Sequence, residues 1–401
     1  MIKNNGWTSE CISTERGIKQ GCHVIGVLFV TANELMSINI RENEDIKGIE
    51  MKDREKKLSN YADDATLTLL HEASINAAMK TILEFCNVSG MKLNIDKTEG
   101  IWLGSCKGNP VFYNGIHFTQ SAVRILGIYI GQNKEECLDK NWMSKIKKLK
   151  NCIHVWKSRK LSIFGKVQIL KSLALSKFVY SMSILSVPPI VIKEITKCFF
   201  GYVWNNVDRI KRKTLMLDYE QGGIKMPDIE SNIQSYRAAW IARLNSIDEN
   251  ENLLFKILSG TKITLQLLLD GNICEKNKFP EKLCIPEFYS ECITCFNMCK
   301  CRKETPEVHS VLTEPIWCND IVVCKGKSLL YKNWIDSGYI YIKDLYKDGQ
   351  FVTSQHVVNT LCEKRNWIVE YKQIRDALNR VTRKMTDIPQ YAMYVNVKNI
   401  V

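Results

Sequence analysis

Hydrophobic and polar residues follow two different periods within the first 130 residues, and these periods predict both helices and strands. Apolar residues recur at helical spacing over 24–40 and over 74–89, and Gly90 is suited to end the second helix. Alternating patterns predict strands at 5–13 (after a turn), 91–99, 111–118 and 123–130. This part of the chain is therefore predicted to be α+β.

The stretch 58–70 has the most informative pattern in this part of the chain. Alternating Thr and Leu follow two adjacent acids, Asp63 and Asp64, which predicts a β-hairpin with the acids at its turn. Asp favours turns because its side chain bonds nearby backbone, so a plain polar turn is one interpretation. Two adjacent carboxylates also repel each other, and a bound cation would compensate their charge. Mg²⁺ commonly binds one or two carboxylates together with substrate phosphates. The dipeptide alone leaves both interpretations open.

The pattern from residue 139 onward is mainly helical. Residues 139–187 predict two helices that separate near Leu161, with Ser162 as the N-cap of the second. Further helices are expected at 195–204 (after Pro188-Pro189), 232–246 and 286–301. The acidic interval 248–251 serves as a boundary for a C-terminal region. We therefore predict three domains, over 1–135, 136–247 and 248–401.

The net charge of +13 is informative about binding partners rather than about the fold. Many of the basic residues are concentrated in one block. Between Asp139 and Tyr180 there are eleven Lys or Arg residues and a single acid. Such a block suits a polyanion, nucleic acid in the first place, although a solvated basic helix face gives the same pattern.

The start of the chain is polar, which predicts no signal peptide, and no stretch approaches the roughly 20 apolar residues of a membrane span. The sixteen scattered cysteines are then expected to be reduced, and the protein to reside in the nucleus or cytoplasm, with no membrane partner.

Cysteines gather at Cys292, Cys295, Cys299 and Cys301, with His309 nearby, and this spacing raises the possibility of zinc. The same cysteines lie on one stripe of the helix predicted over 286–301, with Pro286 in its first turn. Buried free cysteine behaves as a small hydrophobe, so a structural core is the favoured interpretation.

Several motifs follow one another along the chain. They are Arg16-Gly17-x-x-Gln20-Gly21-Cys22, Tyr61-Ala62-Asp63-Asp64, Ser89-Gly90-Met91-Lys92-Leu93-Asn94-x-x-Lys97-Thr98-Glu99, Leu126-Gly127-Ile128, and Trp156-x-x-Arg159-x-Leu161-Ser162-x-Phe164-Gly165-Lys166. Taken in this order, the motifs resemble those of the reverse transcriptases of non-LTR (LINE-type) retrotransposons. The resemblance continues through Trp204 and Gly222-Gly223-Ile224-x-x-Pro227-Asp228 to Pro315-Ile316-Trp317, and so covers nearly the whole chain.

The resemblance implies RNA-directed DNA polymerisation, in which a DNA primer is extended on an RNA template with dNTPs and Mg²⁺. It implies a partial palm over 1–135, a helical thumb with connecting helices over 136–247, and a helical C-terminal region over 248–401. The catalytic and metal-binding residues would be Asp63 and Asp64. The other implied site residues are Arg16, Gly17, Gln20, Gly21, Tyr61 and Lys97 at the nucleotide and template, Leu126 and Gly127 at the primer grip, and Lys145, Lys148, Lys157, Arg159 and Lys166 at the nucleic-acid backbone.

The chain departs from the family in one respect that bears on activity. The family's metal site uses a third carboxylate on a strand well upstream of the Gly-rich loop, with the fingers before it. Only fifteen residues precede Arg16, and their acids, Glu10 and Glu15, lack that context. We therefore expect an amino-terminally truncated enzyme that is inactive as this chain. The alternatives are a non-catalytic nucleic-acid-binding remnant that uses the basic thumb, and an unstable product of a decayed element.

Overall fold

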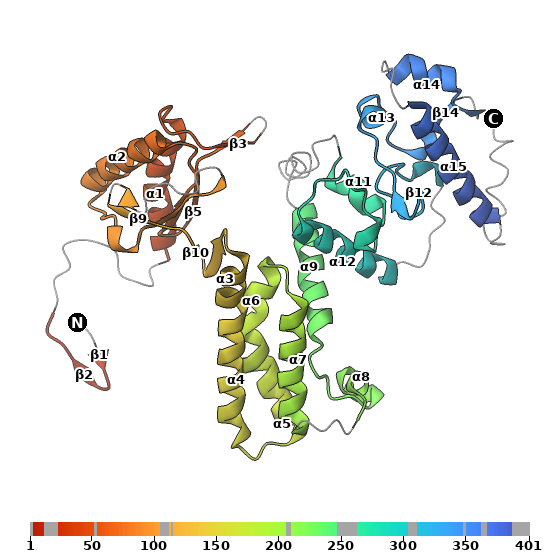
Figure 1. The fold of residues 1–401 in the computed structure, drawn as a ribbon. Coiled ribbons are helices and arrows are strands. Elements are labelled where there is room, and N and C mark those ends of the chain that lie inside the picture. Colours follow the sequence, from red (N-terminus) through yellow and green to blue (C-terminus); the bar gives the residue numbers. More distant parts are fainter. Residues whose placement is uncertain are drawn as a thin grey trace. The chain divides into compact units, whose positions relative to one another are not determined.

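The computed structural model divides the chain into two compact units, Met1–Asp139 and Lys140–Val401. The first unit contains most of the strands, and the second is mainly helical (Figure 1). The structure describes residues 3–11, 23–51, 54–104, 112–113, 115–205, 210–246, 263–303, 311–347, 350–361 and 367–386.

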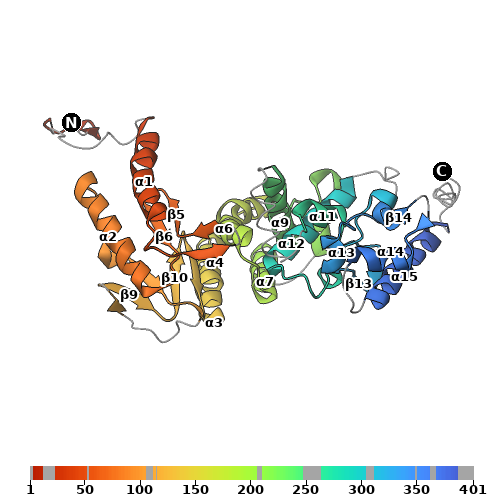
Figure 2. The ribbon, with the colours of Figure 1, turned by 90° about the horizontal axis from the view of Figure 1, so that it is seen from above.

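The first unit combines helices with short strands, as its sequence predicts. Helices α1 and α2 pack against each other and against strand β5, and the contact buries Ile40, Leu58 and Ala78 (Figure 2). The elements are β1 (Lys3–Asn4), β2 (Trp7–Thr8), α1 (Ile25–Glu42), β3 (Ile49–Met51), β4 (Arg54–Lys56), β5 (Leu58–Tyr61), β6 (Asp64–Leu67), α2 (Glu72–Ser89), β7 (Glu99–Ile101), β8 (Phe112–Tyr113), β9 (Ile116–Thr119), β10 (Ala122–Ile125), β11 (Ile128–Gly131) and α3 (Lys134–Leu138).

The strands pair mostly as antiparallel hairpins: β1 with β2, β3 with β4, β5 with β6, and β10 with β11. The remaining strands form one small sheet in the order β7-β9-β8, in which β7 runs parallel to β9. A single bridge between Gly48 and Leu69 joins the segment before β3 to the segment after β6. Together with the helices these hairpins confirm the α+β prediction.

Three predicted strands are wrong. The predicted strand 111–118 is instead two short strands, β8 and β9, which pair antiparallel with Tyr113 opposite Ile116. Within 91–99 the chain forms a 3-10 turn over Ile95–Lys97, because the Asn94 side chain accepts a hydrogen bond from the Lys97 backbone N–H at 3.2 Å. Such local bonds compete with a sheet ladder. The predicted strand 123–130 is instead the β10–β11 hairpin. It reverses at Leu126 and Gly127, whose φ angles of 45° and 83° suit a tight two-residue turn.

The second unit begins with a group of long helices. Helices α4, α6 and α7 lie side by side (Figure 1), with Leu149, Phe178 and Ile195 fully buried between them. Ser162 caps α5 by accepting a hydrogen bond from the Gly165 backbone N–H at 3.2 Å, as predicted. The helices are α4 (Ser144–Lys157), α5 (Ile163–Ile169), α6 (Ser176–Ile184), α7 (Pro189–Trp204), α8 (Arg212–Met216) and α9 (Ile229–Ser246), and π-helical stretches at Asp139–Met143 and Leu170–Leu175 precede α4 and join α5 to α6.

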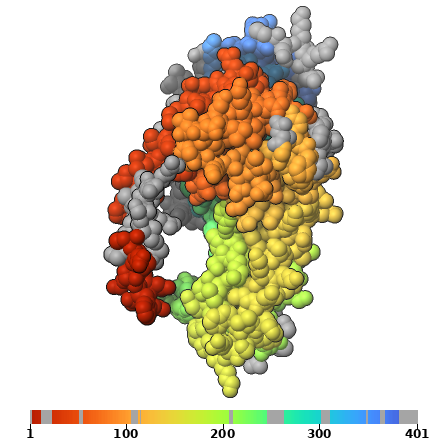
Figure 3. Space-filling view, turned by 90° about the vertical axis from the view of Figure 1, so that its left-hand side faces the viewer, coloured from red at the N-terminus to blue at the C-terminus, as the bar shows by residue number. Residues whose placement is uncertain are grey.

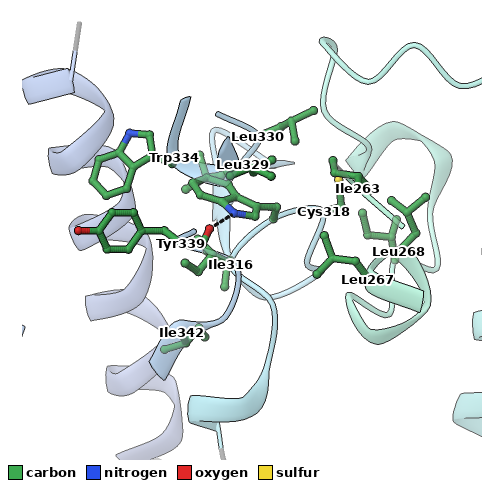
Figure 4. Packing of buried hydrophobic residues seen from close by; sticks show 14 of the residues in the cluster. Ile263, Leu267, Leu268, Ile316, Cys318, Leu329, Leu330, Trp334, Tyr339 and Ile342 are labelled. Atoms are coloured by element: carbon green, nitrogen blue, oxygen red, sulfur yellow. Dashed lines mark hydrogen bonds between the residues drawn. The ribbon is translucent and has the colours of Figure 1, made fainter. Parts of the chain in front are cut away.

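The rest of this unit surrounds the largest core in the described part of the chain. Two fully buried tryptophans, Trp317 and Trp334, lie at its centre, and the Trp317 indole donates to the Tyr339 carbonyl at 2.6 Å (Figure 4). The elements are α11 (Leu265–Asp270), α12 (Glu287–Lys303), β12 (Val323–Cys324), β13 (Lys327–Ser328), α13 (Lys332–Asp336), β14 (Tyr346–Lys347), β15 (Gln350–Phe351), α14 (Ser354–Leu361) and α15 (Trp367–Thr386). The predicted boundary at 248–251 lies outside the described residues.

The helices of the described part lack the combination of length and apolar character that crossing a bilayer would require.

A polypeptide of residues 1–135 is expected to be poorly stable in isolation. Its buried clusters are small, and α1 exposes Val27, Val30 and Leu35 by 67%, 63% and 60%. Contiguous exposed apolar surface favours association. Calorimetry and sedimentation should show a broad transition or self-association. A cooperative, monomeric thermal transition would contradict this expectation.

Candidate polymerase site and basic helices

The two acids lie at the tip of the predicted hairpin. Strands β5 and β6 pair antiparallel, with Tyr61 opposite Asp64, so Ala62 and Asp63 form a two-residue loop. Ala62 has a φ of 53°, a left-handed conformation that tight hairpin loops require. The structure thus confirms the hairpin and places Asp63 in the loop and Asp64 on the first position of β6.

Helix α1 holds this tip in place through polar side chains. The Asn33 amide donates to the carbonyl of Ala62 at 3.3 Å, and the Asn60 amide donates to the Ser37 hydroxyl at 2.7 Å. Ser37 is almost completely buried and donates in turn to the Asn33 carbonyl at 3.1 Å. A chain of bonds therefore fixes the hairpin tip on a rigid helix. The sequence patterns did not predict it, although Asn33 and Ser37 lie four residues apart on one face of the helix, which could have indicated a bound neighbour.

A buried lysine joins the same helix to the base of the hairpin. The Lys57 ammonium, whose side chain is only 6% exposed, donates to the carbonyls of Arg41 and Asn43, each at 2.9 Å. It also lies 3.4 Å from a Glu55 carboxylate oxygen. A cation at the C-terminal end of a helix satisfies carbonyls that have no partner within the helix. Lys57 thus holds the base of the hairpin, just before β5, against the C-terminal end of α1.

The hairpin presents its acids to solvent. Asp63 and Asp64 are both exposed, and Tyr61, opposite Asp64, is 69% exposed. Residues directly opposite on paired strands share one face, so the Tyr61 ring and the Asp64 carboxylate lie on the same side of the hairpin. Adjacent exposed carboxylates can bind a hard cation that brings further oxygen ligands with it. Within the described ranges, no three His, Cys, Asp or Glu side chains gather as a ready-made metal site.

The other predicted site residues of the first unit that the structure describes lie at two places. Lys97 is exposed at the end of its 3-10 turn, and Leu126 and Gly127 form the tip of the β10–β11 hairpin, where Leu126 is 44% exposed. The residues predicted at the nucleotide and template, Arg16, Gly17, Gln20 and Gly21, lie outside the described residues.

The basic residues of the helical block fall into two groups. Lys148, Lys157 and Arg159 are exposed on or just after α4, whose outer surface can be followed in yellow in Figure 3. Lys145 and Lys166 are half-buried and bonded internally. Lys145 donates to the Ser181 hydroxyl of α6, and Lys166 donates to the Val203 carbonyl at 3.1 Å. Three of the five predicted backbone contacts thus face solvent.

The cysteine stripe of α12 is part of the core. Cys292 is fully buried and Cys295 nearly so, and the helix spans the predicted range. Burial raises the pKa of the Cys292 thiol to about 12 and that of Cys295 to about 11, because desolvation disfavours the thiolate. Cys301 and His309 cannot be placed in this cluster, since the side chain of Cys301 and the whole of His309 lie outside what the structure describes.

This burial predicts a large contrast in thiol reactivity. The thiolate is the reactive form, so Cys292 and Cys295 should alkylate far more slowly in the native protein than the exposed Cys11 and Cys284. Brief iodoacetamide treatment at mildly alkaline pH, followed by peptide mass spectrometry, measures each site separately. Labelling of Cys292 as fast as that of Cys284 would contradict the assignment of these thiols to the core.

Two comparisons with known proteins agree with this geometry. Residues 1–130 match the family model described as Reverse transcriptase (RNA-dependent DNA polymerase). The chain is also similar to the "Transposon TX1 uncharacterized 149 kDa protein" of Xenopus laevis, with 22% identity over 329 residues. That alignment covers 80% of this chain and 25% of the relative, so the chain spans about a quarter of the relative's length.

The hairpin with its paired acids lies within the matched residues 1–130, so the candidate site lies in the part of the chain that matches the reverse transcriptase family. The transposon relative extends the similarity over most of the chain. The chain carries a reverse transcriptase region of the non-LTR retrotransposon type.

Proposed function

We propose that this chain is the metal-binding and duplex-holding part of an RNA-directed DNA polymerase of a LINE-type element. The observation that supports this most strongly is the rigidly held hairpin tip, which exposes Asp63 and Asp64 within the residues that match the reverse transcriptase family. Its substrates would be an RNA template, a DNA primer and dNTPs.

The donor set at the tip fits Mg²⁺, although other divalent cations share this preference for oxygen. Mg²⁺ is usually held by one or two carboxylates plus substrate phosphates, and the tip offers two carboxylates open to solvent. When bound, the cation would supply Lewis-acid stabilisation for an in-line displacement at the nucleotide phosphate. Asp63 and Asp64 would bind it, while Tyr61, on the same face as Asp64, would lie beside the primer terminus.

The remaining residues of this unit would position substrates. Lys97 is exposed and could contact the triphosphate, and the Leu126-Gly127 turn projects as a compact tip that suits a primer grip. Arg16, Gly17, Gln20 and Gly21 complete the proposed nucleotide and template contacts by family resemblance. These roles all depend on the polymerase assignment.

A polypeptide limited to these 401 residues is expected to lack polymerase activity. Two-metal catalysis requires enough carboxylates to hold both ions, and the described residues bring no third metal-ligating side chain to Asp63 and Asp64. The second candidate function is therefore non-catalytic nucleic-acid binding, which the exposed Lys148, Lys157 and Arg159 favour.

Both candidate functions predict salt-dependent binding to an RNA–DNA duplex through the outer surface of α4. Replacing Lys148, Lys157 and Arg159 together by Gln should weaken binding by about tenfold or more, and each lost contact should reduce the slope of log affinity against log salt by about 0.9, the B-form value. Fluorescence anisotropy over a salt series measures both quantities.

A matched control carries the same change in net charge. Lys325, Lys332 and Lys347 are exposed in the C-terminal part of the chain, and their replacement by Gln should leave affinity and slope nearly unchanged. Equal losses in both triple variants would show that only net charge matters. Binding that is insensitive to salt would contradict the proposed duplex interface.

A further inference from the structure

A second candidate nucleic-acid site lies at the start of α5. Phe164 of α5 and Tyr219, in a 3-10 turn at Tyr219–Gln221, approach with ring centroids 6.0 Å apart. Their side chains remain 59% and 56% exposed. We call Phe164 and Tyr219 the aromatic pair. Two large aromatic side chains that stay this exposed add little stability through burial, and exposed apolar groups of this kind indicate a ligand-binding surface.

The loop that carries Tyr219 is built to hold it in this position. Its backbone folds back on itself, with hydrogen bonds from Gly223 N–H to the Asp218 carbonyl at 2.9 Å and from Lys225 N–H to the Leu217 carbonyl at 3.0 Å. A Cβ at Gly223 would lie 2.0 Å from the Leu217 carbonyl oxygen, so only glycine allows this close approach. The aromatic pair is therefore pre-organised, which reduces the entropic cost of binding.

The base of the loop is anchored in the helical unit. Leu215 and Met226 are buried, and the Arg212 guanidinium of α8 lies 4.6 Å from the centroid of the Phe200 ring of α7. In Figure 1, α8 lies beside the lower part of α7, near the start of α5. The aromatic pair thus stands on a firm support, while both of its rings remain more than half exposed.

The charges on the segments that carry the pair are mostly positive. The Lys225 ammonium lies 5.3 Å from the Tyr219 ring centroid and 3.0 Å from an Asp218 carboxylate oxygen, so this acid is compensated locally. Exposed cations precede Phe164 and lie at the start of α8, whereas Glu220 is the other exposed acid of the loop. The exposed cations are Arg159, which also belongs to the proposed duplex interface, Lys160, Lys211, Arg212 and Lys213.

From these observations we infer that the aromatic pair is a stacking platform for an unpaired nucleobase of single-stranded nucleic acid. Base stacking on aromatic side chains combined with neighbouring cations for the phosphates is the general chemistry of single-strand binding. A spacing of 6.0 Å leaves no room for a base between the two rings, so the base stacks on the outside of the pair. This inference goes beyond the proposed duplex interface and can hold whether or not that interface exists.

The test compares variants of the full chain for binding to short labelled single strands and to a blunt RNA–DNA duplex. Oligouridylate and oligothymidylate of about 12 nucleotides match single-strand site sizes and separate RNA from DNA as the source of the base. Tyr219→Ala and Phe164→Leu should each weaken binding of a single strand by roughly 5- to 100-fold, the range for loss of one stacked base. Tyr219→Phe keeps the ring and should bind as the wild type does.

The duplex provides the control for folding and for the proposed function. Its affinity should stay within about twofold in all three variants, since stacking on an unpaired base is not involved. Unchanged single-strand binding in Tyr219→Ala would overturn the inference, and so would equal losses for single strands and duplex. If the wild-type protein does not bind the duplex, the proposed duplex interface is contradicted. If Tyr219→Ala still weakens single-strand binding in that case, the stacking platform is supported.

Discussion

Replacing Arg237 by methionine is expected to lower the free energy of unfolding by about 3–5 kcal/mol, because it breaks a buried ionic arrangement by removing one partner. Arg237 lies on α9 and is fully buried. Its guanidinium donates to the carbonyls of Met182 and Leu185 at the end of α6, and its Nε lies 3.4 Å from a Glu291 carboxylate oxygen of α12. Without it, the Met182 and Leu185 carbonyls would lose these donors, and Glu291 would lose the guanidinium and keep the Lys276 ammonium at 3.9 Å.

The neighbourhood shows why methionine cannot replace this function. The Phe288 ring centroid lies 4.6 Å from the guanidinium, so a methionine side chain keeps apolar contact while the donors are lost. Trp240, one turn further along α9, donates to the Ser183 carbonyl, so α9 binds the end of α6 at two points. Losing Arg237 should weaken the junction between the basic helices and the C-terminal core.

Urea unfolding followed by circular dichroism measures this effect, and the same helix provides the control. Arg243 is exposed on α9, and Arg243→Met should change stability by about 0.5 kcal/mol or less, as surface substitutions usually do. If Arg237→Met unfolds within about 1 kcal/mol of the wild type, the guanidinium does not hold the junction together.

Local sequence patterns predicted the elements whose signals are themselves local. The β5–β6 hairpin followed from alternation next to two acids, α5 began at its predicted Ser162 cap, and α12 followed its cysteine stripe. The errors arose where side chains or turns overrode the alternation. Asn94 bonded its own backbone within 91–99, and Leu126, which is not a usual turn residue, adopted a left-handed φ at the tip of a hairpin.

Long-range contacts could not be predicted from the sequence. The bonds from Asn33 to Ala62 and from Arg237 to Met182 join residues far apart along the chain, and no local period encodes such partners. The basic block illustrates the same difficulty, since composition alone does not distinguish Lys148, which is exposed, from Lys145, which is bonded to Ser181. Packing decides which lysines remain accessible to a ligand.

The second large effect concerns the hairpin itself. A polypeptide of residues 1–401 should extend a primer no faster than the background, even with Mg²⁺ and dNTPs present. The tip supplies Asp63 and Asp64, and within the described ranges no third ligand joins them. The proposal gives this chain an incomplete ligand set, which would not hold two metal ions beside a triphosphate, so the displacement would lose most of its stabilisation. The Asp63→Asn, Asp64→Asn double variant should show the same background.

The most direct test of the proposed function measures duplex binding and primer extension in the same samples. Wild-type protein of residues 1–401 is mixed with a labelled DNA primer annealed to an RNA template, and anisotropy and product length are recorded with Mg²⁺ and dNTPs. We predict salt-sensitive binding without extension, for the wild type and for the double variant alike. Failure of both proteins to bind the duplex would contradict the proposed function. Extension by the wild type that disappears in the double variant would contradict the predicted inactivity and would support Asp63 and Asp64 as the metal ligands.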